Sequence, residues 1–141
     1  MSTIKTNTIT GTTSAGSIAI TGEGGSTTTN LQQGLVKSWV HILGKSTATI
    51  PDSFNVSSLN DVGTGIYETA FTNNMANANH SSAGMAREST SDDGNNRLRS
   101  VGFADSSDSI STAQVETVTA YANGSVIDPA TATTITVGEL A

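Results

Sequence analysis

The chain has 141 residues, enough for one domain with a short appendage, and it combines few charged residues (13%) with many threonines and two prolines. This composition predicts ordered β structure with much polar surface and argues against a disordered chain, which is normally rich in charge and proline. The net charge of −6 and the presence of only six basic residues argue against nucleic-acid binding. The lack of cysteine excludes disulfide and thiolate chemistry.

Residues 1–30 are predicted to form an extended segment rich in Thr, Ser and Gly. Two Thr/Ile patches, Thr3–Thr10 and Ser17–Thr21, are separated by a predicted turn at Gly11–Gly16 and followed by a loop or hinge at Gly22–Thr29. A two-stranded piece with so small a core is marginal alone, so we expect its isoleucines to contact partner chains. A disordered tail is the alternative. These candidate anchor residues are Ile4, Ile9, Ile18 and Ile20.

Residues 31–141 are predicted to form a compact β-sandwich or jelly-roll-like domain, since strand-like patterns recur with turns between them. Leu35–Leu43 is apolar on both faces and holds the single tryptophan, Trp39, which predicts a central buried strand. Ser46–Ile50 follows as a second strand, which we expect to end at Pro51.

The middle of the domain alternates between strand and turn signals. Asp52–Leu59 is predicted to be irregular or a short strand, and Asn60–Gly65 a turn. Ile66–Phe71 alternates with both of its aromatic residues on one face, which predicts a sandwich strand. Thr72–Asn79 is predicted to be one helical turn or a loop.

The C-terminal part offers four further strand signals. Ser82–Glu88 and Arg97–Ala104 are predicted to be the two arms of a hairpin, joined by a polar run that contains Asp93-Gly94. Ala113–Tyr121 alternates cleanly, and Ile135–Leu140 is expected to supply the last strand.

Residues that could carry chemistry are scarce. His41 lies inside an apolar strand and His80 has no partner at metal-ligand spacing, so strand packing is favoured over general-base or metal roles. The run at residues 92–96 could bind Ca²⁺ weakly, but it lacks the EF-hand spacing, and a solvated turn is favoured there and at Asp105 and Asp108. A Ser/His/Asp triad has no support in the pattern. The sequence predicts no enzyme, no cofactor and no metal site.

Five pieces are spread over most of the chain: Met1–Ile9, Gly34–Val40, Asp52–Leu59, Gly63–Tyr67 and Val137–Ala141. Together they resemble small fibre-type virion proteins of marine tailed bacteriophages, which are usually labelled tail fibre or short tail fibre. The resemblance implies a homotrimer in which a Thr/Ser-rich N-terminal segment precedes a compact β domain. The family offers no catalytic motif, so the resemblance points to a structural role.

The leading hypothesis is therefore a trimeric virion surface protein that contacts other virion proteins and a host surface receptor, with residues 89–96 and 104–109 as candidate contact loops. A capsid decoration protein, with residues 1–30 as an arm on the shell, is the alternative. A carbohydrate-binding module comes third and requires Trp39 with Tyr67 or Tyr121 as exposed stacking platforms.

The start of the chain lacks the apolar stretch of a signal peptide, and no apolar run approaches the ~20 residues of a membrane helix. We expect synthesis in the host cytoplasm and no membrane insertion.

Overall fold

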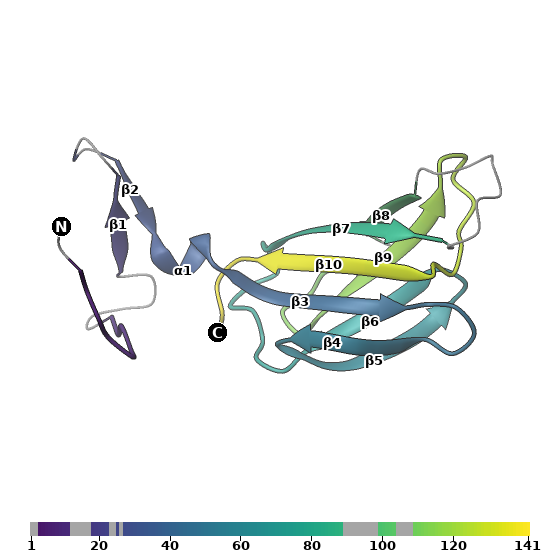
Figure 1. Cartoon of the computed structure of the whole chain (residues 1–141), viewed down its shortest axis with the longest axis horizontal. Coiled ribbons are helices and arrows are strands. Elements are labelled where there is room, and N and C mark those ends of the chain that lie inside the picture. Colours follow the sequence, from purple (N-terminus) through teal and green to yellow (C-terminus); the bar gives the residue numbers. More distant parts are fainter. Residues whose placement is uncertain (1–2, 12–17, 23–24, 26, 89–98, 104–108) are drawn as a thin grey trace.

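The computed structural model describes residues 3–11, 18–22, 25, 27–88, 99–103 and 109–141 (Figure 1). Two four-stranded antiparallel sheets pack face to face, and a two-stranded hairpin stands apart from them. Only one helix, of four residues, occurs in the described part. The predicted all-β sandwich is confirmed.

One sheet has the strand order β4-β3-β10-β7, and the other has the order β5-β6-β9-β8. The strands of the first sheet are β3 (Val36–Leu43), β4 (Thr49–Phe54), β7 (Ser81–Arg87) and β10 (Thr131–Val137). Those of the second sheet are β5 (Val56–Gly63), β6 (Ile66–Phe71), β8 (Arg99–Phe103) and β9 (Gln114–Tyr121). In Figure 1 the first sheet faces the viewer and the second lies behind it.

The core lies between the sheets because alternate residues of each strand point inward. One cluster gathers Val40 and Ile42 of β3 around Tyr67 of β6, and a second holds Phe71 and Val115. Much of the remaining interior is threonine, which explains how a chain with 35% apolar residues still forms a sandwich. The buried threonines are Thr69, Thr117, Thr119, Thr134 and Thr136. Several of these hydroxyls donate to backbone carbonyls inside the sandwich, as buried polar groups require.

The chain passes from one sheet to the other at Asn55, between β4 and β5. Asn55 has a left-handed backbone (φ 57°), a conformation that Asn tolerates better than most residues. Its side-chain amide donates to the carbonyls of Lys37 (2.9 Å) and Asn73 (3.1 Å), and its oxygen accepts from the Asn73 backbone N–H (2.7 Å). The segment Asp52–Leu59, predicted to be irregular or a short strand, thus holds parts of two strands joined at a sharp corner.

Strand β4 runs through Pro51, so the prediction that this strand ends there is wrong. The reason is the position of β4 at the sheet edge, where one side of the backbone has no ladder partner. The pairing with β3 is also irregular opposite Pro51, between His41 and Leu43. Edges and bulges are the places where a sheet tolerates the missing N–H of proline.

The predicted hairpin of Ser82–Glu88 with Arg97–Ala104 is wrong as well. β7 pairs with β10 and β8 pairs with β9, so the two strands belong to different sheets. A strand, a polar run and another strand produce the same sequence pattern whether the connection turns back or crosses the sandwich. The Asp93-Gly94 turn lies outside the described residues. The last strand begins at Thr131, earlier than predicted, and ends at Val137.

The N-terminal hairpin pairs β1 (Ala19–Thr21) with β2 (Thr28–Asn30). The predicted partner of this first strand, Thr3–Thr10, forms no strand, so that pairing is corrected. β2 leads directly into the short helix α1 (Leu31–Gly34), whose first turn is capped by the Asn30 side chain. We call residues 3–30 the arm.

Polar contacts fix the junction between the arm and the sandwich. The Gln33 amide donates to the Glu139 carboxylate (3.0 Å), and the buried Lys37 ammonium donates to the Gln32 carbonyl. Burial lowers the pKa of Lys37, and the nearby Glu139 carboxylate partly opposes this effect. The described helix is far too short to span a membrane.

Candidate interaction face

The outer surface of the β4-β3-β10-β7 sheet carries a row of apolar side chains across all four strands. Trp39 of β3 lies directly opposite Phe54 of β4 on one side and Ile135 of β10 on the other, and Ile135 lies opposite Ala83 of β7. Phe54 and Ile135 are 51% and 47% exposed. Cross-strand neighbours at this spacing touch, so the row forms one continuous apolar band.

Further apolar residues flank this row. Val36 and Val137 pair across β3 and β10 on the side of the arm, and Met85, 77% exposed, projects from β7 on the other side. We call this surface the apolar face, and its residues are Val36, Trp39, Phe54, Ala83, Met85, Ile135 and Val137.

Trp39 was expected in a buried strand, and the structure corrects the detail. β3 does lie in the middle of its sheet, but its core side is formed by Ser38, Val40 and Ile42. Trp39 and His41 point to the outer surface, where both are half-buried. The strand is apolar on both faces because one face meets the core and the other forms the apolar face.

The row next to Trp39 ends at Met85, opposite Thr133, and brings Asp52, His41 and Thr133 together as direct cross-strand neighbours. These are the residue types of a nucleophile, a base and an acid, but no hydrogen bond joins them in the structure. The Asp52 carboxylate instead accepts from the backbone N–H of Ser53 (2.9 Å). The row therefore lacks the base-to-orienter contact that a catalytic triad needs.

The outer surface of the β5-β6-β9-β8 sheet has a different character. Glu68 and Glu116 are direct cross-strand partners there, and the Gln114 amide donates to Glu68 (2.6 Å). Two carboxylates at neighbouring positions favour contact with water, because burying both would leave like charges close together in a low dielectric. The outer surface of this sheet thus carries a carboxylate pair beside the apolar pair of Ile66 and Val118.

Three of the four predicted anchor isoleucines, Ile4, Ile9 and Ile20, are exposed in the arm, and Ile4 is 87% exposed. Ile18 is half-buried beside β2, where its carbonyl accepts from the Leu31 N–H. None of the four joins the sandwich core. Their predicted contacts with partner chains stay a prediction.

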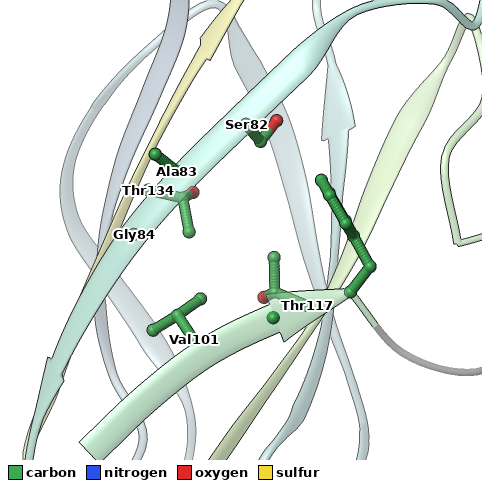
Figure 2. Close-up of a pocket in the computed structure, with 8 residues that line it drawn as sticks. Ser82, Ala83, Gly84, Val101, Thr117 and Thr134 are labelled. Carbon is green, nitrogen blue, oxygen red and sulfur yellow. The ribbon is translucent and has the colours of Figure 1, made fainter.

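Two hollows in the described part of the sandwich lack the size or the lining side chains expected of a reaction site. A cavity of about 80 Å³ lies between β7 and β8, where Val101 and Thr117 of one sheet point toward Thr134 of the other (Figure 2). It is well below the roughly 300 Å³ of typical small-molecule sites. A shallower groove of about 340 Å³ next to α1 is lined by Gln33, Asn77, Asn79, Ser81, Val137, Gly138 and Glu139, and the Gln33 amide already donates to the Glu139 carboxylate.

The remaining predicted candidates are structural or fall elsewhere. The His80 ring is buried edge-on against Phe71, with Nε2 2.9 Å from the Ser111 carbonyl and no partner for Nδ1 among the described residues. Tyr67 is fully buried, so it is not a stacking platform for sugars. Tyr121 is half-buried and donates to Glu88 (2.7 Å). Outside the described residues lie 89–96, which include the run at 92–96, and 104–108, which include Asp105 and Asp108.

Sequence reasoning had named Trp39 and the arm isoleucines but missed Phe54, Met85 and Ile135 as parts of one surface. The missing information was register, because only the pairing of β4, β3, β10 and β7 places these residues side by side. Comparison with protein-family models, with curated proteins and with solved structures finds no match to this chain.

Proposed function

We propose that this chain is a non-enzymatic structural protein of the bacteriophage particle surface, which works as a homotrimer in a tail fibre or a related appendage. The single observation that supports it best is the amount of apolar surface that the folded chain leaves uncovered. The arm exposes Ile4, Ile9 and Ile20, and the apolar face exposes aromatic and aliphatic side chains from four strands. Surfaces of this kind mark interaction sites in soluble proteins.

The shape of the chain supports an anchoring role for the arm. The hairpin and residues 3–11 extend beyond the end of the sandwich, away from the four strands of the apolar face (Figure 1). A segment with so little core of its own gains stability by packing against other chains. In the proposed particle the arm joins the three subunits and the neighbouring virion proteins, and the sandwich faces outward toward a host surface receptor. The virion context itself rests on the sequence resemblance.

The proposed structural role calls for no reaction chemistry. Within them no three His, Cys, Asp or Glu side chains gather where they could hold a metal ion. The one row that combines His41 with Asp52 and Thr133 has no connecting hydrogen bonds. The proposed protein works through contacts and needs no cofactor.

A capsid decoration protein is the second candidate, because an arm with exposed isoleucines could equally lie on a shell. The two roles differ in location. Gold labelling of intact particles with an antibody to this chain is expected to mark the tail; label spread over the head would favour decoration, and binding to purified capsids that lack the protein would then test it.

The trimer is tested by the native mass of the purified full chain, measured by light scattering or sedimentation equilibrium at micromolar concentration. The expected mass is three times the 14.3 kDa of one chain. A stable monomer under these conditions would contradict the proposal.

A further inference from the structure

We infer that the apolar face is the surface on which the sandwiches of neighbouring copies of this chain associate. The inference rests on the proposed homotrimer and names the part of each subunit that faces its neighbours. It assigns an orientation to the sandwich, with the Trp39 row toward the other subunits and the Glu68–Glu116 surface toward solvent.

The arrangement of residue types on the face fits a protein partner. Apolar side chains occupy its middle row, and charged side chains lie toward its edges, with Asp52 on β4 and Arg87 on β7. A depleted charge at the centre with a polar rim is the usual composition of a protein interface. Trp39 is flanked in its own row by Phe54 and Ile135, and the hydrogen-bonding groups of the face lie in the next row along the strands.

The area of the face argues for association that includes the arm. The seven side chains are on average about half exposed, and full burial removes on the order of 100 Å² each, so together they offer roughly 300–400 Å² of apolar surface. A stable interface buries about 800 Å² per partner. The face supplies about half of that area, and the exposed isoleucines of the arm supply further apolar surface. A second copy of this chain, which presents both, fits this requirement.

The distribution of charged side chains over the two outer surfaces also favours the apolar face as the contact surface. The chain carries a net charge of −6, so copies repel one another unless an uncharged surface is available for contact. On the other outer surface Glu68 and Glu116 are direct neighbours, so contact between two copies there would bring four carboxylates together. The apolar face meets its neighbours without burying a carboxylate pair.

The chain provides its own reporter for this contact, because Trp39 is its single tryptophan. In the assembled full-length protein its emission is expected to be blue-shifted and protected from a soluble quencher, and both properties should be lost when dilution dissociates the protein. Sedimentation at the same concentrations gives the mass.

The test substitution is Ile135→Glu, which places a charge in the middle row. It is expected to weaken association by at least about 30-fold, the effect of losing a residue that dominates binding. Val62→Glu is the matched control, since Val62 is 50% exposed on β5 of the other sheet and Ile135 is 47% exposed on β10. The control should keep the wild-type mass and the wild-type Trp39 emission.

A second variant, Met85→Glu, distinguishes lost association from misfolding. Met85 is 77% exposed, so its side chain contributes little to the stability of the single chain. If the wild type is a trimer but both face variants keep its mass and its Trp39 protection, the inference fails and the proposed trimer stands. If the wild type is a monomer, both fail. If Trp39 becomes protected only on adding a glycan, the face is a sugar site and the inference is overturned.

Discussion

Tyr67 is fully buried in the core and forms a hydrogen bond to a carboxylate. Its hydroxyl donates to the Asp128 carboxylate (3.1 Å), which also accepts from the Gly65 N–H (2.6 Å). The β3–β4 connection passes directly over this hydroxyl at Gly44, where a side chain would collide with it. Burial raises the pKa of Tyr67, and the charges of Asp128 and Asp61 raise it further.

This raised pKa predicts a loss of stability at alkaline pH. In the unfolded chain Tyr67 ionises near its ordinary pKa of about 10, whereas the folded state keeps the proton to higher pH. The contribution is therefore complete below about pH 10 and falls as pH rises above it, by at most about 1.4 kcal/mol per pH unit for one group. The free energy of unfolding, measured in urea over this pH range, should fall less steeply with pH in Tyr67→Phe than in the wild type. Equal slopes would contradict the prediction.

Asn55 is the residue that sets the corner between the two sheets. Replacing it with Ala removes its bonds to Lys37 and Asn73 and places an ordinary residue at positive φ, with an expected cost of roughly 2–4 kcal/mol in the free energy of unfolding. Asn55→Gly is the matched variant, because it keeps the backbone conformation and loses only the bonds. It should be less destabilising than Ala by about 1 kcal/mol. Denaturant unfolding of both would show equal losses if the backbone conformation contributes nothing.

Among the elements, the edge strands β7 and β8 show how closely the two sheets approach. A Cβ atom at Gly84 would lie 2.9 Å from Val101 Cγ1 on β8 of the other sheet. It would also lie 2.9 Å from Thr134 Cγ2 and 2.7 Å from the Thr133 carbonyl oxygen, both on the neighbouring strand β10. The small cavity of Figure 2 lies beside this point of contact. Only glycine lets β7 pass β8 at this distance.

Gly84→Ala is therefore expected to destabilise the sandwich by about 1–3 kcal/mol, the usual cost of overpacking. Gly102→Ala on β8 is its control, since a Cβ there would meet Val118 at an ordinary 3.8 Å. The control should change the free energy of unfolding by less than about 1 kcal/mol. Thermal unfolding of the two variants distinguishes them, and a neutral Gly84→Ala would show that the sheets separate at little cost.

The elements also show what the sequence could and could not predict. Ile66–Phe71 was located to the residue because one of its faces is fully buried and alternation is then visible. Trp39 was placed in the right strand, but the face on which it lies could not be predicted, since a strand that is apolar on both faces carries no alternation. Pro51 and the Ser82–Glu88 hairpin failed for a different reason, because edge position and sheet membership are set by partners distant in sequence.

The same limit applied to the candidate site. The arm isoleucines could be named from composition, because a segment with no core of its own must find one elsewhere. Phe54, Met85 and Ile135 could not be grouped, since they lie on three separate strands. Their register is a property of the folded sheet.

At the scale of the whole molecule, the residues of the core differ from the exposed residues that we propose for assembly. The sandwich has its own core, and the described residues of the arm contribute a short hairpin that leads into the capped turn of α1. Such a division predicts that changes in the arm alter association without altering the fold. It also predicts that the free chain is folded before it assembles.

Replacing Ile4, Ile9 and Ile20 together with Ser tests this division. Because all three are exposed in the single chain, the free energy of unfolding of the monomer should stay within about 0.5 kcal/mol of wild type, as for surface substitutions generally. Association should weaken, because serine lacks the apolar side chain that the partner chains cover in the proposed trimer. Unfolding is compared at concentrations where both proteins are monomeric, and mass is compared at micromolar concentration. A trimer that survives the triple substitution would leave association to the apolar face alone, whereas a destabilised monomer would make the arm part of the folding unit.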